Sequence, residues 1–214
     1  MKDNMKYEKF ITGPIDVNTY VVTGNDGSCI VIDPSSGCEE VLSYIAANGL
    51  RPAAVLLTHG HFDHIMGLYE ITDVFNETPV FIHSDDKQFL TDSMINGSAR
   101  VIGVDFTFSK DVTLLSEGVI KIEPFEFTVL HLPGHTPGGC AFLFDNVCFC
   151  GDNIFAGSVG RTDLPGGNFH QLMAGIKEKI LTLPPQTVLC PGHGGRTTVD
   201  REKRLNPYLR EPSG

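Results

Sequence analysis

The chain has no hydrophobic run long enough to cross a membrane. No apolar stretch approaches the roughly 18 residues that a membrane-spanning helix requires. The first ten residues mix Lys, Asp and Asn and contain no apolar segment of the kind that defines a secretory signal. We therefore expect a soluble, cytoplasmic protein with no membrane partner.

The chain also has few basic residues relative to acidic ones. The chain has 16 Lys and Arg against 26 Asp and Glu, which gives a formal net charge of −10. Nucleic-acid surfaces need clustered basic residues, so this balance argues against a nucleic-acid partner. A small anionic molecule is still compatible with the composition where bound metal ions supply local positive charge.

Paired cysteine spacing is absent as well. None of the six cysteines forms a Cys-x-x-Cys pair, which excludes the usual redox and zinc-knuckle motifs. Reduced cysteines of this kind pack as small hydrophobic residues, and only Cys38, beside a Ser-Ser-Gly loop, is expected to be exposed. The cysteines expected in the core are Cys29, Cys140, Cys148, Cys150 and Cys190.

Length and patterning predict one α/β domain over residues 1–214. The hydrophobic content of 41% is enough for a core, and no linker, repeat or low-complexity segment divides the chain. Residues 19–23 and 29–32 are predicted to form a β-hairpin. Apolar residues at helical spacing predict helices at 39–48, 65–75, 86–96 and 169–180, the last with Asn168 as its N-cap.

One short segment concentrates metal-binding side chains. Thr58–His64 has the sequence THGHFDH and directly follows an apolar run typical of a buried strand. Alternate residues of an extended segment point the same way, so His59 and His61 are predicted to share one cation while Asp63 and His64 turn toward another. A polar turn formed by chance is the alternative, and four ligand-type residues in six positions disfavour it.

Three further apolar runs end in a histidine or aspartate next to glycine. His135 follows the run at 127–132, Asp152 follows 147–150, and His193 follows 187–190. Glycine lets the backbone turn sharply and approach whatever the loop encloses. A single histidine is more often structural, but four strand ends of this kind predict loops that meet at one metal site.

The order of these residues resembles the metallo-β-lactamase superfamily of metallohydrolases. The resemblance extends from about residue 19 to His193. The segment 160–167, with the sequence GRTDLPGG, and the ending Asn206-Pro207-Tyr208 are most similar to the small glyoxalase II-like (hydroxyacylglutathione hydrolase-like) branch. The resemblance implies a four-layer αββα sandwich. Full-length glyoxalase II enzymes also carry a C-terminal helical domain that binds glutathione, and from the short stretch after His193 we expect this chain to lack one.

The family pattern implies a dinuclear site. It assigns His59, His61 and His135 to the first metal, Asp63, His64 and His193 to the second, and Asp152 to a bridging position. A thiolate-free, imidazole-rich set suits two zinc ions and also accommodates iron or manganese. The resemblance implies hydrolysis of a small thioester such as S-lactoylglutathione by a hydroxide that bridges the metals. From its place within the cluster, Asp63 is predicted to be a catalytic residue that orients this hydroxide.

Other residues have candidate supporting roles. Asp33, at a predicted strand end, either supports a metal-bound imidazole or only forms a turn. Arg161 either binds a substrate carboxylate or forms an ion pair with Asp163 that shapes its loop. Asn18 and Tyr20 are expected near the substrate mouth. Three histidines match no ligand position: His131 is predicted to be structural, and His83 and His170 to be surface or capping residues.

A second function remains open on this pattern. The resemblance also extends to persulfide dioxygenases, which would use one iron held by His59, His135 and Asp152. The Gly139-Cys140 pair and the segment 161–163 are similar to that branch, whereas 164–167 is more similar to the hydrolases. The oligomeric state is left open, and a partner subunit could complete the substrate pocket.

Overall fold

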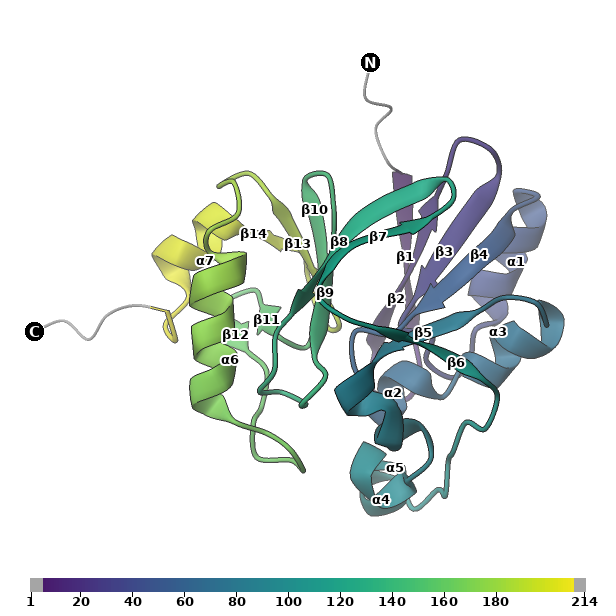
Figure 1. Ribbon diagram of the computed structural model, residues 1–214, viewed down its shortest axis with the longest axis horizontal. Coiled ribbons are helices and arrows are strands. Elements are labelled where there is room, and N and C mark those ends of the chain that lie inside the picture. Colours follow the sequence, from purple (N-terminus) through teal and green to yellow (C-terminus); the bar gives the residue numbers. More distant parts are fainter. Residues whose placement is uncertain (1–5, 210–214) are drawn as a thin grey trace, which may run out of the picture.

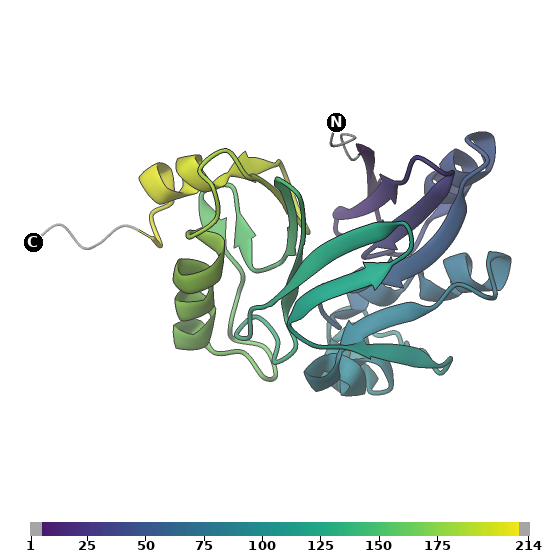
Figure 2. The same cartoon turned by 45° about the horizontal axis from the view of Figure 1, so that its top comes forward.

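The computed structural model describes residues 6–209, which form two six-stranded β-sheets packed face to face, with helices on both outer faces (Figure 1). This is the expected four-layer αββα arrangement. The first half of the chain builds one sheet and the second half builds the other, as the turned view in Figure 2 shows. Within residues 6–209, no helix is long and apolar enough to cross a membrane.

The first sheet begins with antiparallel strands and continues with parallel ones. Its order is β1-β2-β3-β4-β5-β6, and the predicted hairpin is the antiparallel pair β2–β3. The strands are β1 (Lys6–Thr12), β2 (Val17–Thr23), β3 (Ser28–Ile32), β4 (Arg51–Leu56), β5 (Val80–His83) and β6 (Val112–Leu115). Its outer face packs against α1 (Glu39–Ala47), α2 (Phe62–Ile65) and α3 (Leu68–Val74).

The second sheet has the order β14-β13-β10-β9-β8-β7. Its strands are β7 (Gly118–Ile122), β8 (Phe125–His131), β9 (Cys140–Phe144), β10 (Val147–Gly151), β13 (Val188–Pro191) and β14 (Thr197–Thr198), and β11 (Ile154–Phe155) pairs separately with β12 (Ser158–Val159). Helix α6 (Phe169–Gly175), the π-helical turn η2 (Ile176–Ile180) and α7 (Val199–Leu205) cover its outer face. The Asn168 side chain caps α6 by accepting a hydrogen bond from the Gln171 N–H, as predicted.

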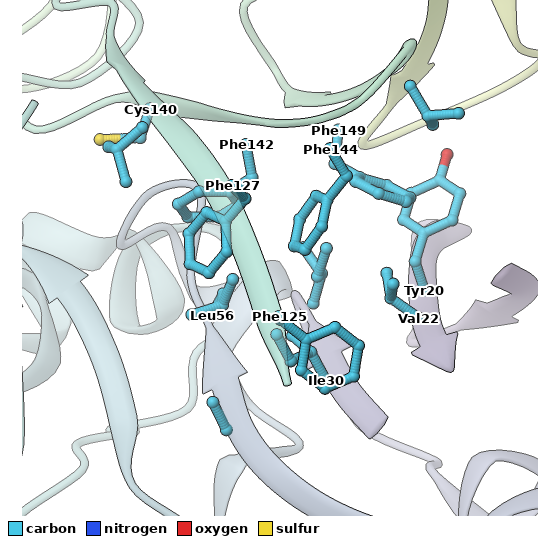
Figure 3. Packing of buried hydrophobic residues seen from close by; sticks show 14 of the residues in the cluster. Tyr20, Val22, Ile30, Leu56, Phe125, Phe127, Cys140, Phe142, Phe144 and Phe149 are labelled. Carbon is cyan, nitrogen blue, oxygen red and sulfur yellow. The ribbon is translucent and has the colours of Figure 1, made fainter. Parts of the chain in front are cut away.

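Aromatic side chains fill the space between the two sheets (Figure 3). Phe127 and Phe144 stack with ring centroids 4.7 Å apart, and they belong to neighbouring strands of the second sheet. Ile30 and Leu56 of the first sheet are fully buried in the same cluster. Each such side chain contributes about 1.5–3 kcal/mol on burial, so this layer fixes the sheets that position the loops at their edge.

The segment between β5 and β6 differs from the predicted single helix over 86–96. It consists of a 3₁₀ helix, η1 (Ser84–Leu90), followed by α4 (Ser93–Asn96) and α5 (Ser98–Val101). Asp92 interrupts the helix because its carboxylate accepts hydrogen bonds from the Met94 and Ile95 N–H groups and starts a new one. Gly97, with φ of 92°, then separates α4 from α5.

Cys38 is buried, so the expectation that it is exposed was wrong. Its thiol donates to the Ser35 carbonyl at 2.9 Å, and its N–H donates to the Glu70 carboxylate at 2.7 Å. The loop that precedes α1 is thus folded onto α3 rather than into solvent. All six cysteines are reduced and buried, as expected for the other five.

Candidate metal centre

The loops that leave β4, β8, β10 and β13 meet at one edge of the sandwich. They bring together every side chain that the sequence assigned to the two metals. His59, His61 and His135 form one group, in which one nitrogen of each ring lies within 4.8 Å of the others. The closest contact joins Nδ1 of His61 to Nε2 of His135 at 2.9 Å. All three rings are buried, so they offer a cation an enclosed set of nitrogen ligands.

Asp63, His64 and His193 form the second group. One carboxylate oxygen of Asp63 lies 3.3 Å from Nε2 of His64 and 3.3 Å from Nε2 of His193. Asp63 and His64 lie in α2, directly after the segment that carries His59 and His61. The start of this short helix therefore turns the second pair of ligands away from the first, as the spacing predicted.

Asp152 lies between the two groups. Its Oδ1 is 3.4 Å from Nε2 of His64, and its Oδ2 is 3.7 Å from Nε2 of His135 and 3.6 Å from Nε2 of His193. One carboxylate thus faces imidazoles of both groups. This is the arrangement required of a ligand shared by two cations.

Four imidazoles are oriented through their Nδ1 atoms. Nδ1 of His59 lies 3.1 Å from the Thr58 hydroxyl, and Nδ1 of His64 lies 3.0 Å from the Asp33 carboxylate. Backbone carbonyls orient the other two rings. The Arg161 carbonyl oxygen is 2.7 Å from Nδ1 of His135, and the Asp16 carbonyl oxygen is 3.2 Å from Nδ1 of His193. Since each Nδ1–H faces an acceptor, each Nε2 is left with a lone pair directed into the site.

Asp33 supports this arrangement from two sides. Besides the His64 ring, it accepts the Thr58 N–H at 2.7 Å and the Thr58 hydroxyl at 2.6 Å. Asp33 has a left-handed backbone conformation, with φ of 51°, which is uncommon for a residue other than glycine. Of the two roles considered for Asp33, the contacts agree with support of a ligand.

Several buried polar atoms of the site have no hydrogen-bond partner within residues 6–209. They are Nε2 of His59, His61 and His64, and Oδ1 of Asp152. Buried polar atoms without partners are costly, so such a cluster is expected only where another group satisfies them. The unsatisfied atoms of His59, His64 and Asp152 fit metal ligation, and the donor set suits zinc, iron or manganese.

The charges around the site favour a cation. Burial opposes protonation of His64, yet Asp63, Asp152 and Asp33 together hold its pKa well above the usual range. Burial acts to raise the pKa of Asp63 and of Asp152, but the neighbouring His64 keeps both carboxyls below their usual range. Burial and then His135 lower the pKa of His61 to about 3, although Asp63 and Asp152 oppose this shift. The carboxylates thus remain charged and His61 stays neutral, as metal ligation requires, and without a metal ion the carboxylates favour a proton on His64 in place of the cation.

Asp86 is a contributor that the sequence reasoning missed. It is fully buried in η1 and accepts hydrogen bonds from the Gly60 N–H (2.9 Å), the Thr136 hydroxyl (2.7 Å) and the Gly138 N–H (2.6 Å). Gly60 lies between His59 and His61, and Thr136 directly follows His135. One carboxylate therefore ties together the two loops that carry the first group.

Asn18 and Tyr20 do not lie at the mouth of the site, contrary to expectation. The Tyr20 hydroxyl donates to the Pro191 carbonyl at 2.7 Å, and the Asn18 amide donates to Pro191 and Gly194 carbonyls at 2.9 and 3.0 Å. Both residues are buried and hold the backbone of the loop that carries His193. Their role is to join that loop to the first sheet.

Arg161 acts on the site through its backbone. Its guanidinium forms a two-point ion pair with Asp163, with both N–O distances at 2.8 Å, and both side chains are exposed. Its carbonyl is the one that orients His135. These contacts agree with the loop-shaping alternative, although Arg161 also lines the cleft described below.

The three remaining predicted non-ligands have other contacts. His83 accepts the Asp85 N–H and so caps η1, but it is buried rather than on the surface. Its ring stacks on that of His131, with centroids 3.9 Å apart and an interplanar angle of 13°. His131 also bonds to the Pro137 carbonyl at 2.9 Å, in keeping with a structural role, and His170 is exposed.

Gly192 is required by the close approach of two loops. A Cβ atom at this position would overlap the Asp152 carboxylate and crowd the His64 ring. We expect Gly192→Ala to weaken metal binding about tenfold, the cost typical of disturbing the support of a ligand. Metal titration of the purified variant would check this. Gly195→Ala is the matched control because a Cβ there meets no atom within 4 Å, and equal losses in both variants would contradict the argument.

The ligand cluster forms the floor of an open cleft of about 200 Å³. Its walls are mainly apolar and come from four separate segments: the β1–β2 loop, α2, the α4–α5 segment and the loop between β12 and α6. The wall residues are Ile15, Phe62, Ile95, Val101, Leu164 and Pro165, and the rim carries Arg100 and Arg161. A substrate would thus reach the cluster between apolar surfaces.

Comparison with protein families gives a match over most of the chain. The family described as the metallo-beta-lactamase superfamily matches residues 12–193, a range that contains every ligand of both groups. A Bacillus subtilis protein named "Probable metallo-hydrolase YqgX" is 38% identical over 96% of this chain and 98% of its own length. A Haemophilus influenzae protein, hydroxyacylglutathione hydrolase GloC, is 33% identical over 92% of this chain and 94% of its own.

Two solved structures are similar in both sequence and fold. BLEG-1, a B3 metallo-beta-lactamase, is 38% identical with a TM-score of 0.92, covering 96% of this chain and all of that one. TTHA1623, solved in a di-iron-bound form, is 38% identical with a TM-score of 0.85, covering 94% of this chain and all of that one. These relatives match the chain over nearly its whole described length.

Proposed function

The chain belongs to the metallo-β-lactamase superfamily, and from this membership we propose that it is a metal-dependent hydrolase of small thioesters such as S-lactoylglutathione. The observation that carries the proposal is the convergence of two ligand groups around Asp152 at the floor of an apolar cleft. The similarity to a hydroxyacylglutathione hydrolase along nearly the whole chain supports the thioester as substrate.

The metal ligands, Asp63 and the apolar walls of the cleft have different roles in the proposed hydrolysis. When bound, two divalent metal ions supply a hydroxide near neutral pH and an electrophile for the carbonyl oxygen. Asp63 lines the cleft and presents a carboxylate oxygen that can accept a hydrogen bond from the attacking water and so fix its direction. The apolar walls limit the access of other water molecules to the cleft. A thiol of pKa about 8.5 leaves readily as the thiolate, so no general acid is needed.

The same contacts favour two metals over one. A single iron held by His59, His135 and Asp152, as in the dioxygenase alternative, would leave the second group, Asp63, His64 and His193, without a cation. Cys140 offers no thiol chemistry to the cleft because it is fully buried, its thiol donates to the Gly138 carbonyl, and burial raises its pKa. We therefore propose the hydrolase alone.

The test is thiol release from S-lactoylglutathione by protein shown to hold two metal ions per chain. We expect turnover on the order of 1–10³ per second, as for most enzymes, and its loss on chelation and recovery when zinc, iron or manganese is restored. A fully loaded protein that releases no thiol would refute thioester hydrolysis. Oxygen uptake with a persulfide, measured on the iron-loaded protein, would then decide for the dioxygenase.

A further inference from the structure

We propose that Arg100 is a specificity-determining residue that binds a carboxylate on the thiol portion of the thioester, which restricts the substrates to thioesters of acidic thiols. The inference rests on the proposed function and adds the chemical class of the thiol carrier. Neither the sequence pattern nor the superfamily ligand set singles out Arg100.

Arg100 differs from the other cation of the cleft in having no partner. The Arg161 guanidinium is neutralised by the two-point pair with Asp163. Within residues 6–209, the Arg100 side chain forms no hydrogen bond and no ion pair, and it is exposed at the rim. In a chain of net charge −10, an unpaired guanidinium above a metal cluster is a local site for an anion.

The segment that carries Arg100 is held rigidly beside the ligand loop. Asn96, fully buried, donates to the Phe89 and Phe106 carbonyls at 2.9 and 3.0 Å and accepts the Ser98 N–H at 2.9 Å. Gly97 packs near the Phe62 ring, which follows His61 in the metal-binding segment. The backbone at Arg100 is therefore positioned relative to the metal cluster by buried contacts, so only the Arg100 side chain itself must be ordered when substrate binds.

The shape of the cleft determines which part of a bound substrate can place a carboxylate beside Arg100. Ile95 and Val101, on the same segment, and Leu164 and Pro165 opposite them are apolar. Of the two arginines that line the cleft, only Arg100 is unpaired within residues 6–209, and it lies at the rim. A carboxylate that reaches it is therefore separated from the scissile carbonyl by an uncharged spacer that passes the apolar walls. For a small acyl group held at the floor, the part of the substrate at the rim belongs to the thiol carrier. A guanidinium binds a carboxylate through two parallel hydrogen bonds, so Arg100 suits this group.

Matched substrates test this directly. S-Lactoylglutathione carries carboxylates on its thiol portion, and its diamide has the same size without those charges. We expect the protein to prefer the carboxylate form about tenfold in kcat/KM, and Arg100→Gln to abolish that preference through KM while kcat stays unchanged. Arg100→Lys should retain part of it. Lys87→Gln, an exposed change of equal charge outside the cleft, should retain all of it.

A binding measurement separates this inference from the proposed function. S-Propylglutathione is a thioether that cannot be hydrolysed, and calorimetry should show about tenfold weaker binding to Arg100→Gln. If the thioesters are hydrolysed but Arg100→Gln keeps the preference, or Arg161→Gln removes it instead, the Arg100 inference is overturned and the hydrolase stands. If no thioester is hydrolysed but thioether binding still depends on Arg100, the hydrolase fails and the recognition stands. If binding is independent of Arg100 as well, both are wrong.

Discussion

Replacing Asp152 with alanine is expected to abolish thioester hydrolysis, with kcat/KM falling at least about 10³-fold. Asp152 faces imidazoles of both groups, with contacts of 3.4–3.7 Å to His64, His135 and His193. Its loss removes a ligand from each metal at once. Elemental analysis after dialysis should show fewer than two metal ions per chain.

The folding of this variant can be separated from its loss of metal. Asp152 accepts no hydrogen bond from a backbone N–H in the described residues, and its Oδ1 has no hydrogen-bond partner there. The metal-free variant should therefore unfold at nearly the same denaturant concentration as the metal-free parent, while metal stabilises only the parent. Asp111→Ala, an exposed loss of equal charge, should keep both metals. Full activity of Asp152→Ala with both metals bound would refute the bridging role.

The metal site was predictable from sequence because its signals are local. The spacing in Thr58–His64 places four ligand-type residues on one turn after a strand, and His135, Asp152 and His193 each follow an apolar run and adjoin glycine. Strand ends of one sandwich meet at the same edge, so the sequence alone predicts that these positions lie together. The helices predicted at 39–48 and 169–180 were predictable for the same reason, since apolar spacing repeats within a single segment, whereas those predicted at 65–75 and 86–96 are interrupted in the structure.

The supporting contacts were not predictable because they join distant parts of the chain. The Tyr20 hydroxyl reaches a carbonyl 171 residues away, and Asp86 reaches partners 26, 50 and 52 residues away. No periodicity or motif reports such pairs. Cys38 was wrongly predicted to be exposed because its Ser-Ser-Gly neighbours are typical of a surface loop. Only the contact with Glu70 of α3 shows that this loop is buried. Local composition predicts a turn but not what packs over it.

Asp86 gives the other large expected effect, because its carboxylate is fully buried and all its partners are donors. Burial raises its pKa, and hydrogen bonds from Thr136, Gly138 and Gly60 offset part of that rise. Alanine at this position leaves two N–H groups and a hydroxyl unpaired in the interior. Asparagine at position 86 would not restore these hydrogen bonds, because the NH₂ group of its amide would face a donor where Asp86 has an acceptor oxygen.

We expect Asp86→Ala to lower the free energy of unfolding of the metal-free protein by about 3–5 kcal/mol, the cost of breaking a buried charged network. The two loops of the first ligand group lose their common anchor, so metal affinity should also fall about 10–100-fold. Urea unfolding and metal titration measure the two effects separately. The neighbouring Asp85→Ala is the matched control, since that side chain is 53% exposed and lies 3.8 Å from His83, and it should cost less than about 0.5 kcal/mol. A variant at Asp86 that loses stability but binds metal as tightly as the parent would show that the loops hold the first group without it. Normal stability would show that the buried donors find other partners.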